Sequence, residues 1–415
     1  MKLDKICLFI LACTMTAACA DLNYTEENTR DEEWTYEYFG EGIKNMVFDV
    51  YAQVYNQEFE TNSTSFLAGA TDEAMYALET GAVNSYTNGG WSVANPIPLT
   101  WDKSYRAISE IHMYLEKIDK ADISEWEHNA NYDTWIQQME LFPYELRFLR
   151  AYFYFELFKT YGDVPLVTTT LTNAQANNVT RTPAAEVVQF IVDELDKAAE
   201  DLPLNISEIA DGNSNMGRAT KGAALALKSR VLLYAASPLY NGNELYKGMT
   251  NYYGEKLFPQ EYDGNKWELA AQAAKAVIDM NQYSLCKSTV NADPFKDGAA
   301  SYQKVLFEPW NEETIWGWWY RTVNDWEGAA GSMLAFSIPN EIGMYGYELL
   351  TPSLKLMDAY PMWESGRYPV EGYQKDADGL DLSRPIIDSK SGYVAEGFTE
   401  DYQQVIDVDP TWATP

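Results

Sequence analysis

The chain has 415 residues, of which 46% are hydrophobic, so it can bury the core of one large domain or two medium ones. Its formal net charge of -32 argues against a nucleic-acid partner, because a strongly acidic surface repels phosphates. Of the four cysteines only Cys286 lies beyond residue 19, and there are two histidines, which excludes a disulfide framework and a cysteine- or histidine-rich metal site in the body of the chain.

The first 19 residues have the pattern of a bacterial lipoprotein signal. Two lysines precede an apolar run over residues 6–15, and small residues stand directly before Cys19. The pattern predicts a signal peptide over residues 1–18 and Cys19 as the acylated N-terminus, whose lipid would anchor the protein to a membrane. An ordinary secretory signal followed by an incidental cysteine is the alternative. Residues 19–38 are polar and are expected to form the lipidated tether.

Apolar residues recur at helical spacing in six stretches of the chain. These stretches are residues 39–59, 101–120, 144–161, 183–199, 219–236 and 267–280. Trp101 begins the second of them and is expected to lie in the core. Small residues on the later helices allow close approach, and helices that follow one another in pairs suggest a tetratricopeptide-like array. No clean period of about 34 residues is visible, so the repeat is degenerate if present.

The stretch over residues 140–167 is predicted to form the central helix of this core. A helix that is apolar on most of its sides must be covered by neighbouring helices on most sides. Pro143 is expected in the first turn, where its missing N–H is no loss. Gly162 is expected to end the helix. Arg147 and Arg150 are charged residues on this buried helix, so we expect them to form structural ion pairs with acidic residues of adjacent helices.

Irregular segments interrupt and follow the helical pattern. Residues 70–100 are rich in Gly, Asn, Ser and Pro and are expected to be a loop region. Residues 313–320 have the β-branched and aromatic content of a strand, in which Trp319 would face one side and Trp316 the other. The remaining expectations are a loop over residues 321–347, a short helix over 351–360 and mostly loop over 361–415.

Four stretches of the sequence resemble the SusD/RagB family, the nutrient-binding lipoproteins of starch-utilisation-type uptake systems. They are the N-terminal signal, LRAYFYF followed by YGDVPL within residues 149–166, residues 223–239 and residues 351–361. The resemblance implies a mainly α-helical fold, a SusD-like array of tetratricopeptide-like helix pairs with large inserted loops and a few short strands. It implies a single SusD-like domain over residues 39–415, which lacks the C-terminal end of the family's domain because the chain stops early by comparison.

No metal, phosphate-loop or dinucleotide fingerprint occurs, so neither a metal ion nor a cofactor is expected. The chain holds 62 Asp and Glu, and carboxylate pairs at any spacing therefore arise by chance, so none stands out as the pair of a glycoside hydrolase. The 30 Tyr and 13 Trp are more than a core needs, and both residue types suit surfaces that are apolar on the face and polar at the edge.

Aromatic residues in polar loops are the candidates for a ligand site. One face of a sugar ring carries C–H groups that can lie against Trp or Tyr, while its hydroxyls need donors and acceptors nearby. The candidates are Trp91, Asn95, Trp319, Trp326 and Tyr345. Binding is favoured over a core position for Trp91 and Trp326. For any other tryptophan a core position is at least as favoured as binding, and Trp101 is expected in the core. The family's ligand site is built from similar inserted loops, and these positions match it by region and spacing only.

The residues and the resemblance together predict a non-catalytic glycan-binding lipoprotein on the surface of a Gram-negative outer membrane. The resemblance implies that it captures oligosaccharide or polysaccharide and delivers it to a partner SusC-like TonB-dependent transporter. Three alternatives remain. The protein could bind peptide or glycopeptide as RagB-like members do, it could be a secreted glycoside hydrolase, or it could be a scaffolding helical-repeat protein without a small-ligand site.

Overall fold

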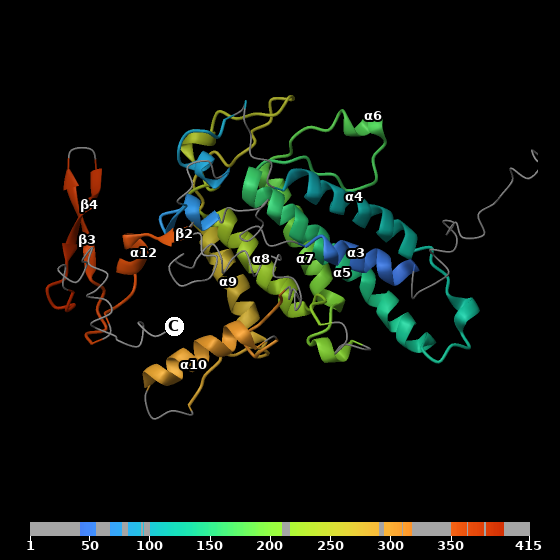
Figure 1. Cartoon of the computed structure of the whole chain (residues 1–415). Helices are drawn as coiled ribbons and strands as arrows, with labels where there is room; N and C mark the ends of the chain where they lie inside the picture. The colour runs from blue at the N-terminus through green and yellow to red at the C-terminus, as the bar shows by residue number, and fades with distance from the viewer. Residues whose placement is uncertain are drawn as a thin grey trace, which may run out of the picture. The chain divides into compact units, whose positions relative to one another are not determined.

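The computed structural model describes residues 42–54, 67–76, 82–92, 94, 100–209, 216–289, 294–308, 310–317, 350–362, 364–376 and 379–393 (Figure 1). These residues fall into two compact units. The helical unit contains the described residues up to 53 and from 100 to 317, and the second unit contains those from 54 to 94 and from 350 onward. The expected limits of the signal peptide, the tether and the single domain stay predictions.

The helical unit is an array in which each long helix packs against the next. Its helices are α3 (Lys44–Ala52), α4 (Trp101–Ile118), α5 (Tyr132–Tyr161), α6 (Asn173–Ala176), α7 (Ala184–Asp201), α8 (Lys221–Ala236), α9 (Asn265–Asp279) and α10 (Pro294–Phe307). Helix α4 packs on α5, α5 on α7, α7 on α8, and α8 on α9 (Figure 1). The predicted mainly α-helical fold of paired helices is thereby confirmed. Within the described segments, none of the helices is at once long and apolar enough to cross a lipid bilayer.

Helix α5 is the central helix, as its aromatic sequence predicts. It is covered by α4, α7 and α8. Its most deeply buried apolar side chains are Phe142, Leu146, Phe148, Leu149, Phe153, Tyr154, Phe155, Leu157 and Phe158. Gly162 ends the helix with a φ of 76°, which confirms the predicted helix end.

The prediction that Pro143 lies in the first turn of this helix is wrong. Helix α5 begins at Tyr132, so Pro143 lies in its interior. An interior proline removes one backbone hydrogen bond and costs about 3 kcal/mol. The burial of one Leu or Phe side chain contributes about 1.5–3 kcal/mol, and Phe142 and Leu146 are both fully buried beside the proline. The burial of apolar side chains therefore outweighs the lost hydrogen bond and carries the helix through the proline.

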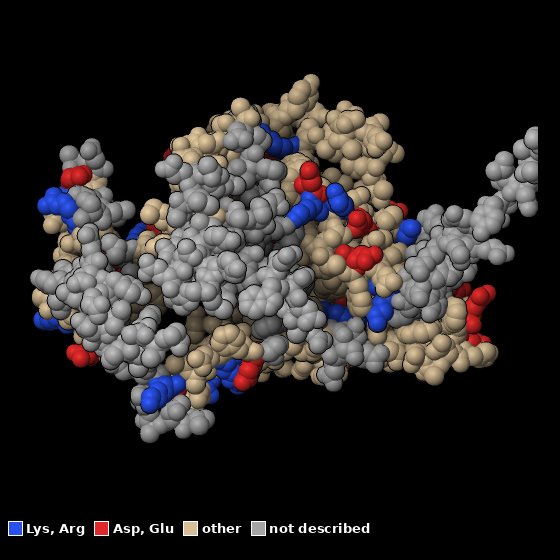
Figure 2. All heavy atoms as spheres, viewed as in Figure 1, with Lys and Arg blue, Asp and Glu red and all other residues tan. Residues whose placement is uncertain are grey.

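The predicted ion pairs of Arg147 and Arg150 are confirmed. Both contact Glu194 of α7, Arg147 through Nη1 to Oε1 at 2.9 Å and Arg150 through Nε to Oε2 at 2.9 Å. The Glu194 side chain is buried, so the two guanidinium groups replace the water that its charge has lost. On the face shown in Figure 2, acidic and basic side chains of the described residues also lie next to one another.

The chain directly after α9 differs from the prediction in two places. No element was predicted for residues 281–312, yet α10 is present. Residues 313–317, the described part of the expected strand over 313–320, form turns and bends. The cause is local, because the Asn311 side-chain oxygen accepts from the Glu313 N–H at 3.0 Å and the Asn311 carbonyl accepts from the Thr314 N–H at 3.1 Å. An asparagine that bonds the backbone two residues on folds it into a turn.

The second unit is built on short strands. Strand β1 (Ala74–Tyr76) pairs antiparallel with β2 (Leu350–Pro352), with Met75 opposite Thr351. The 3₁₀ helices η2 (Leu67–Ala70) and η3 (Ala82–Tyr86) flank β1, α12 (Leu354–Asp358) follows β2, and β3 (Val370–Asp376) forms a hairpin with β4 (Gly379–Ile387).

Three predictions for this unit need correction. The expected loop over residues 70–100 contains β1, and the mostly loop segment expected over 361–415 contains the hairpin. The expected short helix over 351–360 is present as α12, but the first residues of that range belong to β2. Strands β1 and β2 are three residues long and far apart in sequence. Three residues are too few to show the alternating pattern of a strand, and the pairing of β1 with β2 is a long-range contact that no local pattern indicates.

Candidate functional site

A tight turn holds the backbone of Trp91 in the second unit. The Asn84 carbonyl accepts from the Asn88 N–H at 2.8 Å, and the Asn88 side-chain oxygen accepts from the Gly90 N–H at 2.9 Å. The Trp91 N–H then donates to the Ser85 carbonyl at 2.9 Å. These bonds fold the chain after η3 back onto itself and fix the backbone position from which the Trp91 side chain extends.

The Trp91 side chain presents its ring to solvent. It is 54% exposed, and it contacts the ring of Tyr86 edge-on, with the centroids 5.2 Å apart. Tyr86 in turn packs against the buried side chains of Tyr76 and Val83. The indole is therefore supported on one side by an aromatic residue that is itself anchored.

This arrangement suits a ligand that has an apolar face and polar edges. The apolar face can lie against an aromatic side chain, which buries a large area. The polar edge can bond to groups such as the Asn88 amide, which lies in the same turn among polar, exposed residues. Trp91 is exposed in a polar loop, as binding requires. Its role in binding a ligand stays a prediction.

The other predicted site residues are not among those that the structure describes. Asn95, Trp319, Trp326 and Tyr345 all lie outside the described ranges, and so does Cys19. The structure therefore places only Trp91 of the predicted ligand-binding set, and it brings no pair of these residues together. The lipid anchor at Cys19 likewise stays a prediction.

The prediction that Trp101 lies in the core is wrong. It is 38% exposed at the first residue of α4, and it contacts Tyr105 and Tyr161 with centroid distances of 4.9 and 5.2 Å. The Tyr105 hydroxyl donates to the Pro165 carbonyl at 2.7 Å, and burial raises the pKa of Tyr105 well above its ordinary value. Helical spacing could not show this exposure, because a residue at the very end of a helix can extend past the neighbour that covers the rest.

The buried carboxylates of the helical unit are engaged in ion pairs. Glu194 pairs with two arginines, Glu145 pairs with Arg218, and Glu156 contacts Lys159 at 2.9 Å. Each of these carboxylates therefore has a cationic partner. In the described parts of the chain no group of three or more His, Cys, Asp or Glu side chains is placed to hold a metal ion.

Known proteins resemble this chain in sequence and in fold. A SusD-like family model, described as starch-binding and associating with the outer membrane, matches residues 24–233. A SusD-like protein of Bacteroides fragilis, BF3747, has 22% identity and a TM-score of 0.59, and the match covers 84% of this chain and 57% of that one. BT4246 has 22% identity and a TM-score of 0.61, with 82% and 59% of the two chains covered.

A third structure is a SusD-like carbohydrate binding protein of Bacteroides fragilis, BF0978. It has 21% identity and a TM-score of 0.54, with 80% of this chain and 55% of that chain covered. The chain thus spans less than two thirds of the length of these three structures. At this level of identity the likeness shows a shared fold. No curated protein sequence matches the chain.

Proposed function

Because the chain belongs to the SusD/RagB family, within its SusD-like group of starch-binding proteins that associate with the outer membrane, we propose that it is a cell-surface glycan-binding protein. Sugar rings of an oligosaccharide or polysaccharide stack on exposed aromatic side chains, and neighbouring polar groups bond their hydroxyls. The protein binds its ligand and breaks no bond in it.

The exposed, supported ring of Trp91 is the observation that carries this proposal. Its backbone is held by the Ser85 carbonyl and its ring by Tyr86, so little freedom remains to be lost when a ligand binds. We assign Trp91 as the first stacking residue. Asn95 of the same loop region, Trp319 of the expected strand, and Trp326 and Tyr345 of the expected loop over 321–347 are proposed to complete the site, because their aromatic and amide groups suit sugar binding.

The family description also supports a place for the protein in the cell. A lipid on Cys19 would tether it to the outer membrane of a Gram-negative bacterium. There it would deliver its ligand to a SusC-like TonB-dependent transporter. The net charge of -32 would keep the tethered domain soluble at the surface.

Affinity electrophoresis of the mature chain through gels that contain a panel of polysaccharides tests the proposal. We expect one or more glycans to retard the protein, Trp91→Ala to abolish the retardation, and no reducing sugar to be released. Trp126→Ala is the matched control, because Trp126 is also partly exposed but lies in η4 (Ser124–Trp126) of the helical unit.

Three results would contradict the proposal in different ways. Release of reducing sugar would indicate a glycoside hydrolase. Retardation that Trp91→Ala and Trp126→Ala leave equally intact would remove Trp91 from the site. No retardation by any glycan would favour a peptide ligand or a scaffold without a small-ligand site.

A further inference from the structure

A pocket lies in the helical unit, where the residues after α7, before α8 and after α9 meet the segment 310–316. Its volume is about 170 Å³. Its lining combines aromatic, amide and hydroxyl side chains: Asn205, Thr220, Gln282, Tyr283, Trp310, Thr314 and Trp316. The aliphatic side chains of Leu204, Ile206, Met216 and Ile315, with Gly217 and Arg218, complete it.

Trp316 forms a fixed wall of this pocket. Its indole N–H donates to the Gly217 carbonyl at 2.8 Å. Its ring meets Phe148 and Tyr152 of α5 edge-on, with centroid distances of 5.0 and 5.7 Å. Bonded at the nitrogen and packed against the central helix, the indole cannot turn away without losing both contacts.

Trp310 forms a second wall and is held in an unusual conformation. Its φ is 59°, in the left-handed region that bulky residues rarely adopt, and such a backbone costs about 1–3 kcal/mol. Gly217, itself at a φ of 96°, lies against the ring, and a Cβ there would come within 3.2 Å of it. Strained residues of this kind persist where their surroundings hold them, and they occur often at ligand sites.

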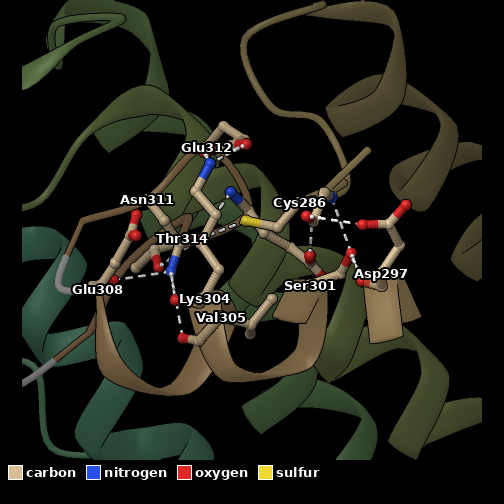
Figure 3. A network of polar contacts seen from close by, with 11 residues as sticks. Cys286, Asp297, Ser301, Lys304, Val305, Glu308, Asn311, Glu312 and Thr314 are labelled. Carbon is tan, nitrogen blue, oxygen red and sulfur yellow. Dashed lines mark hydrogen bonds and ion pairs between the residues drawn. The ribbon is translucent and has the colours of Figure 1, made fainter. Parts of the chain in front are cut away.

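A polar network fixes the turn that carries these walls (Figure 3). The Asn311 amide donates to the Val305 and Glu308 carbonyls at the end of α10, at 3.1 and 2.8 Å. Its oxygen accepts from the Thr314 hydroxyl at 3.2 Å, and Thr314 lines the pocket. Glu312 is paired with Lys304 of α10 at 2.6 Å. The turn is therefore tied to a helix, and the pocket is formed before any ligand arrives.

The polar groups at the pocket are of two kinds. Asn205 and Gln282 are exposed, so their side-chain amides can offer donors and acceptors to a ligand. The Asn205 amide donates to the Gln282 side-chain oxygen at 3.5 Å. Arg218 is buried, with its Nε and Nη2 donating to Glu145. Its Nη1 finds no hydrogen-bond acceptor within the described residues.

We propose that this pocket, whose described lining belongs entirely to the helical unit and does not include Trp91, binds one neutral sugar ring. The ligand is neutral because, among the described residues, Arg218 is the sole charged one in the lining, and Glu145 already balances it. It is a single ring because the volume is below the roughly 300–1,000 Å³ typical of pockets for larger ligands. Two indoles and a phenol supply faces for its C–H groups, while the side-chain amides of Asn205 and Gln282 supply hydrogen bonds to its hydroxyls.

The inference rests on the proposed function for its ligand class, and it can be tested apart from it. The full mature chain would be labelled with fluorinated tryptophan and titrated with glucose, galactose, mannose, xylose and N-acetylglucosamine, one at a time. Fluorine NMR spectra of Trp310→Phe and Trp316→Phe assign the two resonances. We expect at least one sugar to shift both of them.

Variants then place the binding. Gln282→Ala changes an exposed side chain and should leave the fold intact while raising the Kd of that sugar by about tenfold, the loss expected for hydrogen bonds to a bound ligand. Trp91→Ala should leave the Kd unchanged. Trp267→Phe on α9 is a control for a tryptophan that is exposed elsewhere in the helical unit.

The inference is overturned if no sugar shifts the two resonances, if Gln282→Ala leaves the Kd unchanged, or if Trp91→Ala abolishes the shift. If polysaccharide still retards the protein and Trp91→Ala still removes that retardation, the proposed function stands while the pocket is lost. If no polysaccharide retards the protein, the proposed function fails, and the monosaccharide titration decides the pocket alone.

Discussion

Arg218 donates to both carboxylate oxygens of Glu145 in the interior of the helical unit, where the two side chains are 3% and 0% exposed. The Tyr51 hydroxyl donates to the same carboxylate at 2.6 Å and accepts from the Ala219 N–H at 2.8 Å. This cluster joins α3 and α5 to the residues before α8. Burial, followed by the Glu145 charge, raises the pKa of Tyr51 well above its ordinary value.

Glu145→Ala is expected to lower the free energy of unfolding by about 3–5 kcal/mol, because it leaves the Arg218 charge buried without a partner. Urea denaturation checks this. Asp279→Ala is the matched control, since it breaks the exposed pair with Lys275 and should cost less than about 1 kcal/mol. Equal losses in the two variants would show that the buried pair contributes nothing beyond a surface one.

His112 on α4 makes the stability depend on pH. It is buried, and burial followed by the charge of Arg150 lowers its pKa from 6.5 to about 4. Because the unfolded chain takes up a proton near pH 6.5 that the folded protein does not accept until about pH 4, its contribution is full above pH 6.5 and falls with decreasing pH between these values. The loss approaches about 3 kcal/mol below pH 4.

Urea denaturation of the wild type and of His112→Leu across this pH range measures the effect, because all other groups titrate alike in both proteins. We expect the difference in unfolding free energy between them to change by roughly 3 kcal/mol from pH 7 to pH 4, in favour of the variant at low pH. A difference that stays constant with pH would show that His112 is protonated equally in the folded and unfolded states.

The sequence predicts the features that depend on local pattern. Apolar spacing located the helices of the core. Two arginines on an apolar helix predicted ion pairs with an acidic residue of an adjacent helix, which is Glu194 of α7. Features that depend on distant residues escaped it. The pairing of β1 with β2 joins two three-residue segments, and the pocket at Trp310 is assembled from four separate stretches. Of the ligand site, an exposed Trp91 follows from its polar loop, whereas the exposure of Trp101 depends on where neighbouring helices end.

Pro143→Ala is expected to stabilise the protein. Alanine restores the N–H that an interior proline lacks and removes its clash with the preceding turn, a gain of up to about 3 kcal/mol. The half-buried ring of Pro143 gives up some contacts in return, so the net gain should be about 1–2 kcal/mol in urea denaturation. A loss of stability would show that the core around Phe142 is shaped to a bend that the proline imposes.

Gly222→Ala, in the first turn of α8, is expected to destabilise the protein, because a Cβ there would come within 1.9 Å of the Tyr283 hydroxyl. The ring would have to move, at a cost of about 1–3 kcal/mol, which exceeds the gain of up to about 1 kcal/mol from replacing glycine in a helix. Gly298→Ala on α10 is the control, since nothing lies near its Cβ position, and it should stabilise by that smaller amount.

The Tyr283→Ala background then separates the two contributions at Gly222. Without the ring, Gly222→Ala should change sign and stabilise the protein by up to about 1 kcal/mol, as Gly298→Ala does. Urea denaturation of the single and double variants gives the coupling directly. If Gly222→Ala stabilises the protein while Tyr283 is present, the ring does not occupy the first turn of α8, and the wall that Tyr283 gives the pocket is lost with it.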